Sequence, residues 1–232
     1  MTETVRPELL IARLTSDNEV WRVDAEARLI GLGAAAVPLL VGAMHHASSA
    51  VRIHAAHALA RIRDPRGIGP LVAALGDTDA NGAGAIAAEK ALVEWGEPVK
   101  KALLEGAQSG PEPTRARAVR ALGRIGGPEL EKPLRELIGS PSPGVRTQAA
   151  AGLAEILGSR AAEALVPLLS DPDKWVRYGV AEALVKVGSA RGEAVLQEAA
   201  NDPEEKGTHT QFWAEELLDQ LSELKRTGRA SG

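Results

Sequence analysis

The chain contains no cysteine among its 232 residues, and only four Trp, one Tyr and one Phe. Without cysteine it has no disulfide framework, no thiol nucleophile and no cysteine-ligated zinc or iron–sulfur site. Alternating runs of Val, Ile, Thr and Tyr are missing, so we expect essentially no β-sheet. No apolar run reaches the length of a membrane span, and the start of the chain lacks the basic and apolar regions of a signal peptide. These absences predict a soluble, cytoplasmic protein without a membrane segment.

Alanine, leucine and valine supply most of the apolar content, and hydrophobic residues make up 44% of the chain. Small and aliphatic side chains of this kind suit closely spaced helices. The formal net charge is −4, so the field of the whole molecule does not favour non-specific binding to nucleic acid or to an anionic membrane.

A repeat organises the chain. Five arginines are each followed by a leucine seven residues later, and the intervals between these arginines are 30, 63, 31 and 31 residues. They are Arg22, Arg52, Arg115, Arg146 and Arg177. The long interval hides one more unit, in which Ala85 replaces the arginine, and a last unit has Thr210 at this place. A period of this size is typical of stacked helical repeats.

Within each unit the apolar residues follow a helical period. With the arginine position counted as zero, positions −1, +3, +7 and +10 lie on one stripe of a helix, and position +7 is always leucine. Glycine stands at +11 in several units, where a helix end favours positive φ, and a second amphipathic helix with an early proline follows. With an opening helix at residues 7–14, the pattern predicts about seven helix pairs in residues 1–224 and a disordered tail at 225–232.

The segments AVRIHAAHALARIRDPRGIGPLVAAL, TRARAVRALGRIGGPELEKPL and DKWVRYGVAEALVKVGS resemble HEAT repeats, most closely the short kind named after phycobilisome lyases. The resemblance implies an all-α fold, a right-handed α-solenoid of HEAT-like helix pairs. It also implies that the repeated arginine is structural and pairs with an acidic loop residue. Asp17, Asp171 and Asp173 are available for this role, and where a unit lacks an obvious aspartate we expect backbone carbonyls to accept from the arginine.

Positions +2, +5 and +9 are the polar ones, and in a solenoid they are expected to line the concave face, where partners commonly bind. The candidate binding residues on this face are His54, His57, Arg61, Lys90, Arg117, Arg120, Arg124 and Phe212. Three of them, Arg117, Arg120 and Arg124, share one face of a helix and repel one another unless an acidic group offsets their charge. The pattern favours a docking site for an acidic protein segment, with an ordinary solvated helix face as the alternative.

Neither of two metal-site patterns is complete. His45, His46, His54 and His57 lie close together in the sequence, but a metal site needs more ligands in a suitable geometry. The deoxyhypusine hydroxylases, a HEAT-repeat family, hold two irons through His-Glu pairs, and this chain has no His-Glu dipeptide. We therefore expect no metal and no other cofactor.

The third repeat has an unusual loop. Asp77, Asp79 and Asn81 match the opening of a calcium-binding EF-hand loop, which makes them weak candidates for a calcium site. The closing acid, Glu89, comes one residue too late, and Gly84 stands where a hydrophobic residue belongs. A local hinge at the glycines is the preferred interpretation.

No nucleophile, base and orienting group converge in the sequence, so no catalytic residue is assigned. The prediction for function is a non-enzymatic scaffold that binds another protein. The resemblance to phycobilisome lyases leaves bilin attachment or detachment, with a bilin as small-molecule ligand, as an alternative. HEAT-like DNA glycosylases, which grip phosphates with a basic concave face, suggest nucleic-acid binding as a third possibility that the net negative charge disfavours.

Overall fold

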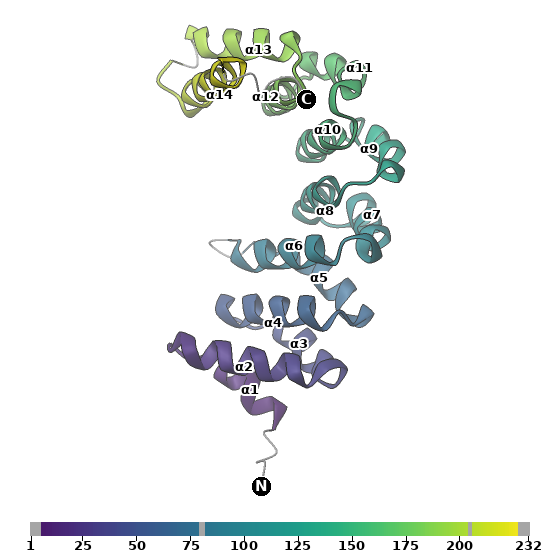
Figure 1. The fold of residues 1–232 in the computed structure, drawn as a ribbon, viewed down its shortest axis with the longest axis vertical. Helices are drawn as coiled ribbons and strands as arrows, with labels where there is room; N and C mark the ends of the chain where they lie inside the picture. Colours follow the sequence, from purple (N-terminus) through teal and green to yellow (C-terminus); the bar gives the residue numbers. More distant parts are fainter. Residues whose placement is uncertain (1–5, 79–81, 204–205, 227–232) are drawn as a thin grey trace. The chain divides into compact units, whose positions relative to one another are not determined.

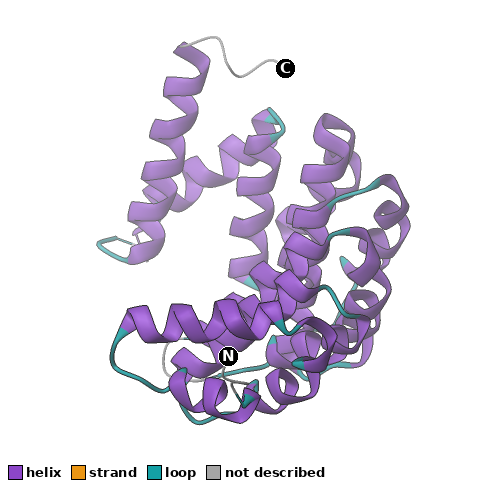
Figure 2. Cartoon of the chain, turned by 60° about the horizontal axis from the view of Figure 1, so that its bottom comes forward, coloured by secondary structure: helices purple, strands orange, loops and turns teal. Residues whose placement is uncertain are grey.

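The computed structural model of the protein describes residues 6–78, 82–203 and 206–226; at 209, 210, 224 and 225 only the backbone is described. The chain divides into two compact units, Met1–Ile125 and Gly126–Gly232, which we describe separately. Every regular element in the described residues is a helix (Figure 2).

The α-helices of the first unit are α1 (Pro7–Arg13), α2 (Glu19–Gly31), α3 (Val37–Ala43), α4 (Ser49–Ile62), α5 (Ile68–Ala74), α6 (Ala83–Trp95), α7 (Lys100–Ser109) and α8 (Glu112–Ile125). Those of the second unit are α9 (Glu131–Leu137), α10 (Pro143–Leu157), α11 (Ala162–Leu165), α12 (Lys174–Lys186), α13 (Ala190–Asn201) and α14 (His209–Arg226). Short 3₁₀ helices connect them at Gly33–Ala35, Pro65–Gly67, Glu97–Val99, Pro128–Leu130, Gly158–Ala161 and Val166–Ser170.

The helices form two layers in each unit. In the first unit α2, α4, α6 and α8 pack side by side in chain order, and we call them inner helices (Figure 1). The outer helices α1, α3, α5 and α7 each pack against the inner helix that follows. In the second unit α9, the segment from α11 to Ser170, and α13 pack in the same way against the inner helices α10, α12 and α14. The predicted all-α solenoid of seven HEAT-like helix pairs is confirmed.

The predicted apolar stripe forms the core. The leucines at +7 in the first six repeats are at most 1% exposed. They are Leu29, Leu59, Leu92, Leu122, Leu153 and Leu184. Burial of one such side chain contributes roughly 1.5–3 kcal/mol, so repetition of this position alone accounts for much of the stability of the stack.

Helix ends follow the sequence pattern. The glycines at +11, Gly33, Gly96, Gly126 and Gly188, all have positive φ, as predicted for residues that end a helix. In the second repeat Arg63 takes this left-handed conformation instead, with φ of 56°. Its guanidinium donates to the carbonyl of Glu94 at 2.7 Å and so links two neighbouring repeats.

The last helix reaches the end of the described residues. The helix α14, which carries the Thr210 position, extends to Arg226, and the remainder of the expected tail lies outside the described residues. Among the described helices, none combines the length and the hydropathy of a bilayer-spanning segment.

Candidate functional site

The repeated arginines bind the loops that precede their helices. In four repeats Nη1 of the arginine donates to the carbonyl of the residue six positions earlier; the pairs are Arg22–Ser16, Arg52–His46, Arg146–Ser140 and Arg177–Asp171. The side chain of that same loop residue accepts from the backbone N–H two positions later in all four loops. Each loop is thus held by one side chain of its own and by the arginine of the next helix.

Two of these arginines also reach a carboxylate in the following repeat. Arg146 donates from Nε and Nη2 to Asp171 at 2.8 and 2.7 Å, and Nε of Arg52 lies 2.7 Å from Oδ2 of Asp77. The Asp171 carboxylate lies beside the Arg146 guanidinium, which holds its pKa below the ordinary value of 3.8 and raises the pKa of Arg146. The carboxylate partner therefore comes from the next loop in the chain.

This finding corrects the expected pairing. Carbonyls do accept from the arginines of the second and fifth repeats, but these repeats also obtain an aspartate from the unit that follows. Arg22 pairs with Glu19 rather than with Asp17. Asp173 caps α12 through the N–H groups of Trp175 and Val176.

The third repeat compensates for its missing arginine. Arg117, from α8, donates through Nη1 to the carbonyls of Leu75 and Asp77 at 2.6 and 3.0 Å. It thereby binds the loop that precedes α6, a task that the repeated arginine performs elsewhere. Arg117 is half-buried and engaged in this contact, so it is not a free member of the predicted basic stripe.

Gly84 lies inside α6 and is needed for close packing. A Cβ atom at this position would stand 2.4 Å from Oδ2 of Asp77 and 3.1 Å from Nε of Arg52. The absence of a side chain therefore makes room for the ion pair between the second and third repeats, which gives this glycine a packing role.

A buried carboxylate gathers two of the predicted arginines. Glu89 of α6 has a side chain only 4% exposed, and its two oxygens share the N–H of Arg120 Nε at 2.9 and 3.0 Å. Nη2 of Arg120 also contacts it, and Nη1 of Arg124 lies 3.2 Å away. The side chains of the two arginines are 44% and 56% exposed. Glu89 thus supplies the acidic group that their spacing requires, and it fixes both cations at the surface of α8.

The repeat pattern marks Glu89 as an unusual residue. It stands at position +4, where other repeats have a small or apolar residue such as Ala56 or Val119. The other acid at this position is Glu26, whose carboxylate accepts a hydrogen bond from Nδ1 of His54 on the next inner helix. An acid at +4 therefore pairs with a basic residue of the following repeat.

The remaining candidate binding residues differ in accessibility. Arg61 and Lys90 are exposed on α4 and α6, whereas His57 is half-buried and His54 is buried. Phe212 is 60% exposed on α14 in the second unit. Of the predicted residues, the structure brings Arg120 and Arg124 together on one carboxylate.

The predicted metal ligands can be followed only in part. Among the described residues no group of three or more His, Cys, Asp or Glu side chains could hold a metal ion. Asp77 is paired with Arg52, and the candidates Asp79 and Asn81 lie outside the described residues. His46 accepts a hydrogen bond from the N–H of Ser48, which is a structural contact within its loop.

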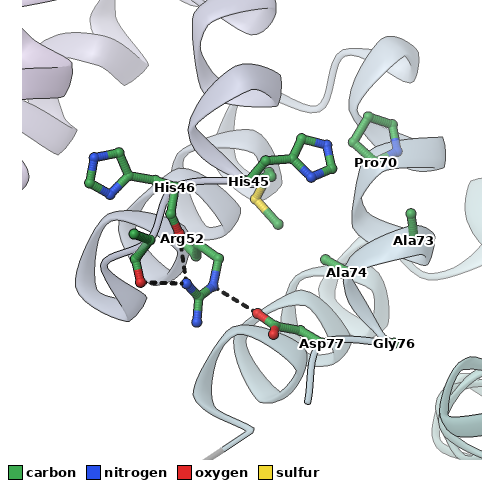
Figure 3. A pocket seen from close by; sticks show the side chains of 10 residues that line it. His45, His46, Arg52, Pro70, Ala73, Ala74, Gly76 and Asp77 are labelled. Carbon is green, nitrogen blue, oxygen red and sulfur yellow. Dashed lines mark hydrogen bonds and ion pairs between the residues drawn. The ribbon is translucent and has the colours of Figure 1, made fainter. Parts of the chain in front are cut away.

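A pocket of about 430 Å³ lies between the loops of the second and third repeats (Figure 3). Arg52 stands in it with its guanidinium directed to the carbonyls of His46 and Ala47 on one side and to Asp77 on the other. Pro70 and the alanines of α5 form an apolar wall. Its charged groups bind each other and the backbone, so the pocket is the junction of two repeats, without a nucleophile poised for chemistry.

Comparisons with known proteins agree with this architecture. The sequence profile of HEAT repeats matches residues 7–93, 100–169 and 148–214. No curated protein matches the chain. Similar solved structures include the complex of CpcE and CpcF of phycocyanin lyase from a Nostoc species, with 20% identity, a TM-score of 0.41 and coverage of 94% of this chain and 96% of that one.

Two further structures have comparable similarity. Human deoxyhypusine hydroxylase is 21% identical, with a TM-score of 0.37 and coverage of 92% of this chain and 96% of that one. An archaeal HEAT-like repeats protein from Thermococcus onnurineus is 14% identical, with a TM-score of 0.46 and coverage of 96% and 99%. Because the repeat profile matches most of its length, the chain belongs to the family of HEAT-repeat proteins.

Proposed function

We propose that this protein is a non-enzymatic scaffold that binds an acidic segment of a partner protein on the inner helices α4, α6 and α8 of the first unit. The observation that carries the proposal is a row of exposed cations on these neighbouring helices, which we call the cationic row. It consists of Arg61, Lys90, Arg120 and Arg124. Glu94, exposed on α6, is an acidic residue near this row.

The electrostatics of the row support an acidic partner. Glu89 neutralises only one of the two guanidinium charges that it binds, and it is buried beneath them. Arg61 and Lys90 form no hydrogen bond or ion pair with the described residues, so their charges remain available to a ligand. Hydrogen bonds between charged groups are stronger than those between neutral ones. A guanidinium that is already held in place also loses less side-chain freedom when a ligand binds.

The two alternative functions receive less support from the same geometry. A phosphate-gripping face requires several unneutralised arginines, but Arg117 is engaged with loop carbonyls and the other two arginines of α8 share a carboxylate. Bilin chemistry would need a cavity with groups placed to add or remove a thioether, and the charged groups of the pocket in Figure 3 bind one another instead.

Charge reversal within the first unit tests the proposal. The variant Arg61→Glu with Lys90→Glu changes the cationic row without touching Glu89. The matched control, Lys101→Glu with Arg160→Glu, makes the same change in charge on exposed residues outside the row. Both variants and the native protein are immobilised, exposed to nuclease-treated lysate of the source organism, and eluted with a salt gradient for mass spectrometry.

We expect one or more proteins with an acidic segment to be retained by the native protein and the control, lost from the row variant, and released by salt. Cross-links from Lys90 to the acidic segment then place the contact. Retention of the same proteins by the row variant would contradict the proposal, and a coloured eluate would favour a bilin ligand instead.

A further inference from the structure

The inner helices of the first unit also expose aliphatic side chains. Val23 on α2 is 52% exposed and Ile86 on α6 is 60% exposed, while Ile53 on α4 between them is half-buried. All three stand at position +1 of consecutive repeats. At about 100° per residue this position lies nearly opposite the core stripe, so these side chains are on the face turned away from the outer helices. We call Val23, Ile53 and Ile86 the apolar row.

Contacts between the inner helices hold the apolar row in register. Glu26 of α2 meets His54 of α4, which fixes the first two inner helices relative to each other. The indole N–H of Trp95 on α6 donates to the carbonyl of Ala60 on α4 at 2.9 Å, and Gly84 lies against Arg52 near the other ends of these helices. The helices α2, α4 and α6 lie side by side (Figure 1), and these contacts join positions at most two residues apart in the repeat.

The cationic row runs beside the apolar row on the same face. Its members stand at +5 or +9, that is, four or eight residues further along the inner helices, or about 6 to 12 Å at 1.5 Å per residue. The surface is thus divided into an apolar half near the starts of the inner helices and a cationic half near their ends. Two exposed aliphatic residues, on α2 and α6, thus flank the half-buried Ile53 of α4, and cations border this row on one side. An apolar strip bordered by charged residues is typical of an interaction surface.

We infer that the acidic segment bound by this surface is an amphipathic helix that lies across α2, α4, α6 and α8. Its apolar stripe packs on the apolar row, and Asp or Glu residues along one flank of that stripe meet the cationic row. Inner helices packed about 8–10 Å apart set a span of roughly 25–30 Å, which corresponds to a partner helix of about 18–20 residues. Helices with apolar residues at i, i+3, i+4 and i+7 commonly bind grooves in this way.

This inference rests on the proposed function and adds the conformation of the partner. An extended acidic segment would need only the cationic row and would make no regular use of Val23 and Ile86. A helix requires both rows at once, because the spacing of its apolar residues places its acidic flank on one side. Binding of a helix would therefore depend on the apolar row, whereas binding of an extended segment would not.

Synthetic peptides distinguish these cases. The probe is a fluorescein-labelled peptide of 20 residues with Leu at helical spacing and Glu along one flank. One control peptide has the same composition in a permuted order without helical amphipathicity, and a second has Lys in place of Glu. Fluorescence anisotropy measures binding to the full chain, and circular dichroism confirms that each protein variant is folded.

We expect the native protein to bind the amphipathic acidic peptide about tenfold more tightly than either control peptide. Val23→Ser with Ile86→Ser should weaken this binding by about tenfold or more, because two exposed aliphatic contacts are lost. The control Trp175→Ser, which removes an exposed aromatic side chain in the second unit, should bind as the native protein does. Lys90→Glu should also weaken binding, and Lys101→Glu should not.

Equal binding of the permuted acidic peptide, still weakened by Lys90→Glu, would overturn the helical conformation and leave the acidic-segment scaffold intact. Binding of the lysine peptide as tightly as the glutamate peptide would overturn both, since the cationic row would then not select charge. Unchanged binding in the Val23→Ser, Ile86→Ser variant would remove the apolar row from the site.

Discussion

Two clusters of arginine and carboxylate, one in each unit, bury different partners. In the second unit the side chains of Arg146 and Asp171 are both shielded, with 12% and 8% of their surface exposed. In the first unit only the acid is shielded, since Glu89 is 4% exposed while Arg120 and Arg124 are 44% and 56% exposed. Both clusters join neighbouring repeats, but only the Glu89 cluster of the first unit presents cations to solvent.

The difference distinguishes a contact within the fold from the binding surface that we propose. Arg146 directs its donors to Ser140, Pro141 and Asp171, so its charge is satisfied within the protein. Glu89 leaves part of the charge of its two arginines unbalanced and fixes their positions. The comparison implies that mutations in the Arg146 cluster change stability, whereas mutations in the Glu89 cluster change both stability and the binding of anions.

The largest effect is expected from Arg146→Ala. The substitution removes a largely shielded side chain, 12% exposed, and leaves the Asp171 carboxylate without its main partner, so the free energy of unfolding should fall by about 3 kcal/mol. Urea denaturation followed by circular dichroism measures this change. The control Arg135→Ala removes a pair with Glu131 that is 40% and 37% exposed, and it should cost less than about 0.5 kcal/mol. Equal midpoints for Arg146→Ala and the native protein would show that the arginine is not structural.

The pH dependence of stability tests the same ion pair, Arg146 with Asp171. The Arg146 guanidinium holds the pKa of Asp171 below its ordinary value of 3.8, so the folded protein binds this proton less readily than the unfolded chain does. The stabilisation is complete above the unfolded pKa and is lost as the pH falls through the folded pKa. The difference in Tm between the native protein and Asp171→Asn should therefore be constant above about pH 5 and shrink towards lower pH. A difference independent of pH would assign the effect of the substitution to something other than charge.

The sequence predicts what each repeat shares and little of what joins one repeat to another. The leucines at +7, present in every unit, and the glycines at +11, present in four, are recognisable because the repeats that carry them place them in the same environment. The pairing of Arg146 with Asp171 depends on which loop lies next to which helix, and this follows from the stacking of repeats. Arg117 binds carbonyls 42 and 40 residues earlier in the chain, a contact that no feature within one repeat reveals.

The residues that depart from the repeat pattern are the ones that point to the candidate site. The sequence identified Arg120 and Arg124 as a strained pair of like charges but did not identify Glu89 as their partner. An acid at a position that is otherwise apolar was the available signal, and it points to a buried interaction. The apolar row was missed because Val, Ile and Ala at +1 match the general composition of a helical repeat.

The substitution Glu89→Gln should separate stability from binding in the first unit. Loss of the carboxylate removes charged hydrogen bonds to two arginines, and the free energy of unfolding should fall by about 1–2 kcal/mol. The same change adds one net positive charge beneath the cationic row, so the amphipathic acidic peptide should bind about two- to fivefold more tightly at low salt. In the matched variant Asp171→Asn stability should fall while peptide binding is unchanged. Weaker peptide binding by Glu89→Gln would mean that holding the arginines in place matters more than their net charge.

The smallest effect is expected from His46→Asp, which gives Arg22 a carboxylate partner in the next loop, as Arg146 has in Asp171. His46 and Asp171 occupy the same place in their loops, since each accepts from the N–H two residues later and offers its carbonyl to the arginine six residues later. Nε of Arg22 is buried and has no hydrogen-bond partner among the described residues. An aspartate at position 46 would approach Arg22 as Asp171 approaches Arg146, and the free energy of unfolding should rise by about 1 kcal/mol.

The control for this gain is Ala47→Asp, which adds the same charge one residue away. Its side chain starts from a different place in the loop, so we expect no gain from a contact with Arg22. The double variant His46→Asp with Arg22→Ala should lose the gain, because the new carboxylate then has no guanidinium to bind. If His46→Asp stabilises the protein equally with and without Arg22, the effect comes from capping of α4 by an acid near its first turn, and the pairing of arginine with the next loop is not a general device of these repeats.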